Sequence, residues 1–230
     1  MSPKRAKAGV RAGSDALGPA LRCDAERNRS RLVAAAHEVF AEQGLQAPMI
    51  EVARRAGVGI ATLFRRFPTR DDLITATFAE TMTDYARAID AAVADPDPWQ
   101  GFCGYVERVC AMQAHDRGFT DVLTRTFPND TSFEAERDRA FRAFTALIQR
   151  AKSVGRLRPD FVPEDLVMML MANAGVISAA SDAAPETSPR LVAYLLQSFA
   201  AESAQPLPPP PTPRGVYRAL RRLHQQKETC

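Results

Sequence analysis

The residues best suited to chemistry lie in one short segment, residues 52–63, with the sequence VARRAGVGIATL. Two short helices are predicted to meet there at a turn that contains Gly57, an arrangement typical of a helix-turn-helix. Ala53 is small enough for two helix backbones to cross closely, and Gly57 can adopt the left-handed conformation that such a turn needs. The second helix of the unit is then free to enter a DNA major groove about 12 Å wide. The segment therefore predicts DNA binding.

Three polar side chains of this second helix have suitable chemistry for contacts with DNA. Thr62, near its start, can bond to a phosphate or a base edge. Arg65 and Arg66, near its end, can reach phosphate or a guanine edge, which is the commonest specific contact. Each of these residues also has an alternative role without DNA. The threonine hydroxyl could bond to the backbone of its own helix, and the two arginines could form a solvated surface pair.

The residues just before Thr62 have side chains with almost no hydrogen-bonding capacity. Such residues allow the helix to approach DNA closely and to touch thymine methyl groups, which predicts only modest direct readout of the bases. They are Gly59, Ile60 and Ala61.

Further basic residues precede the segment. Arg27, Arg29 and Arg31 begin the predicted first helix near the expected path of the DNA backbone, so we expect at least one to contact phosphate. Lysines and arginines between residues 4 and 11 could reach the minor groove, although a solvated tail is the simpler interpretation.

The net charge of +3 is the sum of three unlike parts. Residues 1–78 carry a net charge of +5, residues 79–203 carry −6, and residues 204–230 carry +4. A basic first third beside an acidic middle indicates that one end of the protein meets a polyanion and the remainder does not.

Helical periodicity without any convincing period of two predicts an all-α protein. The division is a disordered basic arm (1–26), a helix-turn-helix domain (27–78), a larger helical ligand-binding and dimerisation domain (79–203), and a Pro-rich spacer with a basic tail (204–230). Nine helices are expected, with these approximate bounds: 27–44, 48–56, 59–66, 70–93, 98–116, 119–125, 131–153, 163–180 and 188–201.

The segment from Arg31 to Leu73 resembles the N-terminal DNA-binding domain of TetR-type (TetR/AcrR) transcriptional regulators. The resemblance rests on the helix end FAEQG at 40–44, the Ala-Gly-Val turn at 56–58, the Thr-Leu-Phe run at 62–64 and the Phe67-Pro68 stop.

This resemblance implies a role for Arg70 as a phosphate contact at the start of the following helix. It also marks departures: Phe64 stands where a tyrosine is usual, so a phenolic contact with phosphate is lost, and Ala61 stands where a glycine is usual. Arg66 replaces a common histidine and supplies a fixed charge. The resemblance further implies a homodimer on a palindromic operator, with two reading helices about 34–36 Å apart.

The middle domain is expected to hold an unknown small apolar or amphipathic effector, and methionine-rich apolar surfaces suit irregular ligands. A plain hydrophobic core is the alternative for each residue taken singly. The candidate pocket residues are Phe102, Tyr105, Val109, Met112, Phe119, Phe141, Phe144, Met168, Met169 and Met171.

The last two long helices have apolar faces that resemble the four-helix dimer interface of the family. The candidate interface residues are Leu166, Leu170, Val176, Ile177, Leu191, Tyr194 and Leu195.

The sequence contains no pattern that indicates a catalytic site, a metal site or a membrane span. The three histidines lie far apart, and no metal-binding pair, nucleophile elbow or phosphate-cradling loop is present. We therefore expect no enzyme activity, cofactor or metal. The four scattered cysteines favour the reducing cytoplasm, and no apolar run approaches the ~18 residues of a membrane span.

A ligand-responsive repressor is the favoured interpretation, in which effector binding selects a dimer whose reading helices are badly spaced for DNA. Two alternatives stay open. One is a DNA-binding regulator or activator without a small-molecule ligand, and the other is a helical enzyme or adaptor that shares the fold.

Overall fold

The computed structural model describes residues 17–125, 127, 130–180, 183–216 and 218–219. Over these residues the chain is helical, with no β-strand and one isolated bridge between Leu157 and Ala200. The fold class predicted from the sequence is confirmed. The helices are α1 (Leu17–Gln43), α2 (Met49–Ala56), α3 (Ile60–Arg66), α4 (Arg70–Thr77), α5 (Ala79–Ala94), α6 (Pro98–His115), α7 (Arg117–Thr124), α8 (Thr131–Ser153), α9 (Pro163–Ala180), α10 (Thr187–Phe199) and a short 3-10 turn, η2 (Ala201–Ser203).

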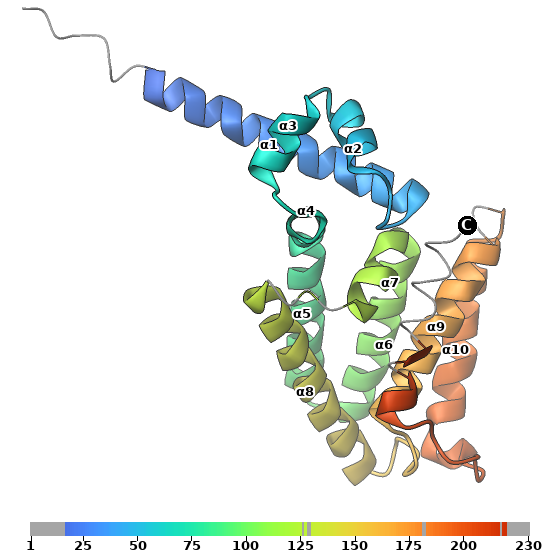
Figure 1. The fold of residues 1–230 in the computed structure, drawn as a ribbon. Coiled ribbons are helices and arrows are strands. Elements are labelled where there is room, and N and C mark those ends of the chain that lie inside the picture. Colours follow the sequence, from blue (N-terminus) through green and yellow to red (C-terminus); the bar gives the residue numbers. More distant parts are fainter. Residues whose placement is uncertain (1–16, 126, 128–129, 181–182, 217, 220–230) are drawn as a thin grey trace, which may run out of the picture.

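The helices form two groups that meet near α4 and α7. Figure 1 shows α1 lying across one end of the molecule, with α2 and α3 packed on it, and the bundle of α5 to α10 beyond. The N-terminal core includes Val39, Val52 and Leu63, which are fully buried. The arrangement holds α3 at the end of the molecule away from the bundle (Figure 1).

The first helix is longer than predicted. It begins at Leu17 rather than near Arg27, so residues 17–26 are helical and do not form a disordered arm. Strong helix formers in this stretch favour the extension, and Pro19 lies in the first turn, where a missing N–H is tolerated. Residues 1–16 of the predicted arm lie outside the described residues.

The single helix predicted over residues 70–93 is wrong, because Phe78 divides it into α4 and α5. Neither proline nor glycine marks this break. The Phe78 ring is fully buried, with its centroid 6.5 Å from that of Phe40 on α1, and it packs so closely on Gly118 that an added Cβ there would lie 2.8 Å from its Cζ. Packing against α1 and α7 therefore fixes the bend, and local sequence gives no sign of it.

Most predicted helix ends are confirmed. Gly44, Gly57 and Gly155 all have positive φ, as expected for residues that end helices. Thr69 and Asp72 form a capping box at α4, and Asp97 caps α6 through the amides of the next turn.

Thr131 and Glu134 have the spacing of a capping box but do not form one. The N-cap of α8 is Asp130, whose carboxylate accepts a hydrogen bond from the Phe133 amide at 3.0 Å. The Glu134 carboxylate instead accepts from the amide of Phe127 at 2.6 Å. The carboxylate of Asp130, the residue just before Thr131, therefore caps the helix through a charge-assisted hydrogen bond.

The core of the bundle is an aromatic cluster around Phe102 on α6. Its ring stacks at 5.6 Å from Trp99 and 6.0 Å from Phe144, and it meets Phe161 edge-on at 5.2 Å. Offset and edge-on pairs of this kind add about 0.5–1.5 kcal/mol each to burial. The cluster ties α6 to α8 and to the loop before α9.

The proline-rich segment leaves the bundle beside Arg158. This buried guanidinium holds Asp160 and donates to the carbonyls of Ser198 and Gln205. Residues 205–214 are exposed, and a helical turn begins at Pro213 and buries Val216. Residues 220–230 of the predicted basic tail lie outside the described residues.

Candidate nucleic-acid interface

The turn between α2 and α3 is built around Gly57. Its φ of 64° and ψ of 37° place it in the left-handed region, and its amide donates to the Arg54 carbonyl at 3.1 Å. The Val58 amide donates to the Ala53 carbonyl at 3.0 Å, so two of the last carbonyls of α2 are satisfied by the turn. This geometry confirms the conformation predicted for Gly57 and sets the angle between the two helices.

Arg31 stabilises the turn from the side of α1. Its guanidinium donates to the Ala56 carbonyl at 2.6 Å, and its Nη2 would lie 2.8 Å from a Cβ at Gly57. Arg29, two residues earlier, lies with its guanidinium 5.9 Å from the centre of the Phe67 ring. Both arginines therefore have contacts within the domain that the sequence did not reveal, and their predicted DNA contacts stay predictions.

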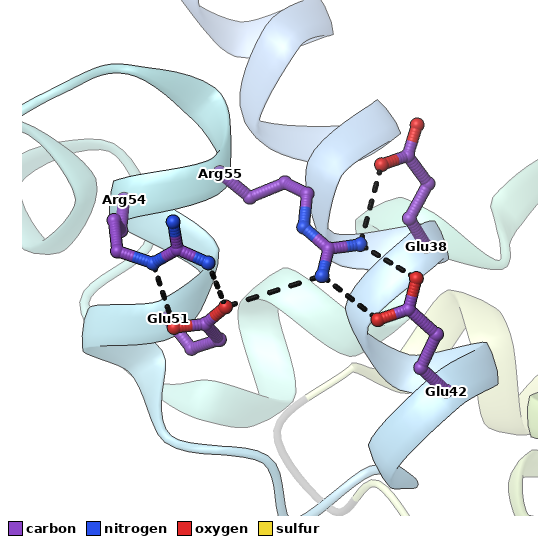
Figure 2. Close-up of polar contacts among 5 residues, drawn as sticks. All are labelled: Glu38, Glu42, Glu51, Arg54 and Arg55. Atoms are coloured by element: carbon purple, nitrogen blue, oxygen red, sulfur yellow. Dashed lines mark hydrogen bonds and ion pairs between the residues drawn. The ribbon is translucent and has the colours of Figure 1, made fainter.

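A carboxylate network fixes α2 on α1 (Figure 2). Arg55 forms a bidentate pair with Glu42 at 2.7 and 2.8 Å and lies 3.5 Å from Glu38. Arg54 pairs with Glu51 along α2, at 2.5 and 3.0 Å. These hydrogen bonds hold the pKa of Glu42 and the pKa of Glu51 below the ordinary value. Two arginines of the motif are thus already neutralised by the protein.

The outward face of α3 is left open. Leu63 is fully buried, while Ala61, Phe64 and Arg65 are exposed, with 46% of Phe64 accessible. Thr62 and Ile60 are partly buried, and Ile60 packs against the domain core. The helix therefore presents a surface of apolar groups and one end of positive charge.

The two arginines at the end of α3 differ in their surroundings. Arg66 lies 3.4 Å from Glu26 on α1, in an exposed pair of the kind that contributes little. Within the described part of the chain, Arg65 makes no ion pair. Arg65 is therefore the cation of α3 most available to a partner.

The fold does not require glycine at position 59, the N-cap of α3. Its φ of −71° is open to any residue, and an added Cβ would meet no heavy atom within 4 Å. The missing side chain instead leaves open space at the exposed start of α3.

Arg70 has a structural role that the sequence did not predict. Its guanidinium donates to the carbonyls of Leu45 and Ala47, in the loop between α1 and α2. Burial and the nearby charge of Arg125 lower the pKa of Arg70. Its predicted contact with phosphate stays a prediction, made from a side chain that the loop already holds.

The candidate pocket residues lie in three different places. Most of the candidate residues that belong to the bundle lie in its core, where Phe102, Val109 and Phe144 are almost fully buried. Met112 and Phe119 belong to the other core, around α1 and α4. Three face outwards in part: Phe141, Met168 and Met171.

Tyr105 has an unusual position in the bundle core. It is 1% exposed, its ring lies 5.1 Å from Phe144 and 6.0 Å from Tyr85, and its hydroxyl interacts with the Tyr85 hydroxyl without reaching the geometry of a hydrogen bond to any described residue. Burial raises the pKa of Tyr105 well above its ordinary value. A buried hydroxyl whose polar neighbour is poorly placed loses part of the hydrogen bonding that it would have in water.

An open groove of about 470 Å³ lies between α5 and α6. Its lining includes charged side chains of both signs, among them Asp84, Arg87 and Arg108. Tyr105 also lines it and is the one candidate pocket residue to do so. The other predicted residues are not gathered around this groove.

The candidate dimer residues form a partly open apolar surface on α9 and α10. Tyr194 is 57% exposed, and Val176, Ile177, Leu191 and Leu195 are partly buried, whereas Leu166 is buried in the bundle core. Leu170 packs against that core as well. Some apolar side chains of this surface are therefore not covered by the rest of the chain and are accessible to a partner.

Two polar contacts between the domains were missed by sequence reasoning. His37 on α1 lies 3.0 Å from the carboxylate of Asp116, which also caps α7, and Asp71 on α4 pairs with Arg125 at 2.8 Å. The partners in each pair are far apart in sequence, so no spacing could have indicated them. Both pairs join the DNA-binding domain to the two ends of α7.

The thiols of α6 are poorly suited to redox chemistry. Burial raises the pKa of Cys103 and the pKa of Cys110 to about 12 each, with nearby acidic groups adding to the shift of Cys103. The reactive thiolate is therefore scarce at neutral pH. In a protein with C23S and C230S, we expect both thiols to react slowly with a disulfide reagent at pH 8, and rapidly after denaturation. Rapid labelling of the folded protein would contradict this prediction.

Two further kinds of site, for a metal ion and for a membrane span, are not found in the described residues. No group of three or more His, Cys, Asp or Glu side chains there could hold a metal ion. Among the helices in that part of the chain, none is long and apolar enough to cross a membrane.

A glycine-turned helix pair with an exposed second helix, joined to a larger helical domain, defines a helix-turn-helix DNA-binding regulator. Comparison with protein families agrees with this class. The family described as "Bacterial regulatory proteins, tetR family" matches residues 32–77, and "Transcriptional regulator SbtR-like, C-terminal domain" matches residues 97–198. Together the matches cover more than half of the chain, and the chain belongs to the TetR family of transcriptional regulators.

The curated proteins that this chain resembles match a short part of it. An HTH-type transcriptional regulator of Staphylococcus aureus strain USA300 is 39% identical over 54 residues, which is 23% of this chain and 29% of the relative. The alignment thus spans less than a third of that relative's length. The proteins that this chain is similar to are regulators rather than enzymes.

Solved structures share the fold over about three quarters of this chain. A regulatory protein of the tetR family from Rhodococcus RHA1 is 22% identical, with a TM-score of 0.58 over 75% of this chain and 96% of its own. A putative fatty acid metabolism regulator from Clostridium perfringens is 13% identical, with a TM-score of 0.57 over 77% of this chain and 100% of its own. At these identities the likeness concerns the fold alone.

Proposed function

We propose that this protein is a homodimeric transcriptional repressor that binds a palindromic operator and is released by a small apolar or amphipathic effector. The observation that carries the proposal is the open face of α3, with Arg65 available and Gly59 leaving space at its start, in a domain matched by the family. Such a regulator acts in the cytoplasm, where it meets the chromosome.

The dimer is supported by the apolar surface on α9 and α10. Tyr194 and the partly buried side chains around it are of the aromatic and aliphatic types that interface cores favour. A two-fold axis through this surface would place two copies of α3 on one side of DNA, one helical turn apart. Each half-site of the operator would then meet one reading helix.

The effector response is supported by the buried hydroxyl of Tyr105. An effector that opens the aromatic core around Phe102 and Phe144 and accepts a hydrogen bond would satisfy this group. Such a ligand would favour the opened state through its differential affinity. The pairs of His37 with Asp116 and of Asp71 with Arg125 would carry the change from the bundle to the DNA-binding domain.

A second candidate is a DNA-binding regulator or activator without a small-molecule ligand. The observation in its favour is the close packing of the candidate pocket residues, of which Phe102, Val109 and Phe144 are almost fully buried. Selection of operators from a random DNA pool, followed by a screen for compounds that release the protein, separates the two candidates. Release by a compound supports the repressor with an effector, and binding without any release supports the second candidate.

The phosphate and base contacts are tested with the double variant Arg65→Ala, Arg66→Ala. We expect operator affinity to fall about tenfold or more, and the slope of log affinity against log salt to become shallower by about 1 per lost phosphate contact. The exposed Arg142 on α8 provides a matched control, since Arg142→Ala removes a similar charge far from α3. Unchanged affinity and slope in the double variant would contradict the assignment.

A further inference from the structure

Three of the four exposed side chains of α3 form one stripe, and the fourth, Arg66, lies beside Glu26. Ala61, Phe64 and Arg65 are spaced by three and four residues, so they share a face of the helix opposite the buried Leu63. Of these groups, one is a methyl, one is a phenyl and one is a guanidinium. Any contact made at the centre of this face is therefore apolar.

Phe64 is the largest of these groups and is only partly covered by the protein. Its side chain is 46% exposed at the end of the molecule where α3 lies (Figure 1). With the exposed Ala61 on the same face, it makes this part of the helix apolar next to the cation at its end. Its position, one turn after the open start of α3, places it where the helix would enter a groove.

Some of the polar groups near α3 are paired within the protein. Arg54 and Arg55 are held by glutamates on α1 and α2 (Figure 2), and Arg66 lies beside Glu26. Thr62 is partly buried against the domain. The exposed hydrogen-bonding side chains of α3 thus lie at its end, at Arg65 and Arg66, and its start and centre carry apolar groups.

The major groove offers one apolar group to such a surface, the C5-methyl of thymine, and alanine and phenylalanine are among the side chains that contact it. We infer that α3 reads its half-site chiefly through pyrimidine C5-methyl groups, which Phe64 and Ala61 contact. This inference rests on the proposed function as an operator-binding protein. It identifies thymine, or a cytosine that carries the same methyl group, as the required base opposite this face.

The test replaces single thymines of a selected operator by deoxyuridine, which removes the methyl group and keeps every hydrogen bond. We expect one thymine in each half-site to be required, with affinity falling about fourfold for one half-site and about sixteenfold for both. Deoxyuridine outside the half-sites serves as the control and should have no effect. 5-Methylcytosine at the required position should restore more affinity than cytosine does.

The protein side of the contact is tested with Phe64→Ala and Phe64→Leu. In Phe64→Ala the deoxyuridine penalty should nearly disappear, and in Phe64→Leu it should be partly kept, since an apolar group remains. Because Phe64 is exposed, both variants should unfold at the temperature of the unchanged protein. A deoxyuridine effect of the same size in Phe64→Ala would overturn the role of this residue.

The outcomes separate the inference from the proposed function. If the protein selects an operator and every deoxyuridine substitution leaves affinity unchanged, or if the half-site contains no thymine, the inference is overturned and operator binding stands. If no sequence is preferred over random DNA, the proposed function fails and the inference fails with it.

Discussion

Replacement of Gly59 by aspartate is expected to abolish operator binding while leaving the fold intact. The fold tolerates the change because Gly59 has an ordinary φ of −71° and open space around it. Aspartate is also a better N-cap than glycine and lies favourably at the positive end of α3. In the complex, however, the carboxylate would face phosphate at the closest approach of the helix. Like charges brought together at an interface cost several kcal/mol, so we expect affinity to fall at least about a hundredfold.

Two measurements on three variants decide this prediction. Thermal unfolding of Gly59→Asp should match or exceed that of the unchanged protein, and a fluorescence titration with operator DNA should show the loss of binding. Gly59→Ser separates size from charge and should bind with an intermediate affinity. Gly104→Asp, at another open glycine on α6, places the same charge far from α3 and should keep operator affinity. Full operator affinity in Gly59→Asp would show that α3 does not lie in the DNA interface.

Helix ends were predictable from the sequence where the cause is local. Gly44, Gly57 and Gly155 end their helices in the left-handed conformation because that conformation is costly for other residues. The period of apolar residues in α2 and α6 likewise reports which face is buried, and this needs no knowledge of the partner helix. All-helical architecture and the turn of the DNA-binding motif follow from such local signals.

Features set by tertiary contacts were not predictable in this way. The division of α4 from α5 at Phe78 depends on a ring packed against α1 and α7, and helix propensity carries no record of it. The same holds for Arg31 and Arg70, whose carbonyl partners lie 25 and 23–25 residues away in sequence. Sequence identifies these arginines as charged, but only the fold shows that each bonds first to the protein.

The candidate pocket illustrates a further limit of apolar patterns. Phe102 and Phe144 share helical spacing with residues that line ligand sites, yet the same spacing is required of any residue in a helical core. The distinguishing sign is a buried polar group that is poorly satisfied, and here it is the hydroxyl of Tyr105 beside Tyr85. This depends on what surrounds the hydroxyl, so residue type alone could not single it out.

Replacement of Gly57 by alanine is expected to destabilise the DNA-binding domain more than the same change at Gly44. Both glycines have positive φ, so alanine at either position costs roughly 1–2 kcal/mol. At Gly44 the new methyl group meets no atom within 4 Å, whereas at Gly57 it would lie 2.8 Å from the Arg31 Nη2 and displace that guanidinium. Loss of the Arg31 bond to the Ala56 carbonyl adds about 1 kcal/mol.

The unfolding free energy of each variant measures this difference. Gly57→Ala should lose about 2–3 kcal/mol, which combines the strain of the left-handed conformation with the lost hydrogen bond. In an Arg31→Ala background the excess over Gly44→Ala should vanish, because the displaced group is already absent. Equal losses at the two glycines with Arg31 present would show that its contact with the turn contributes nothing. An excess that persists without Arg31 would place its origin in the turn itself, and the angle between α2 and α3 would then depend on Gly57 alone.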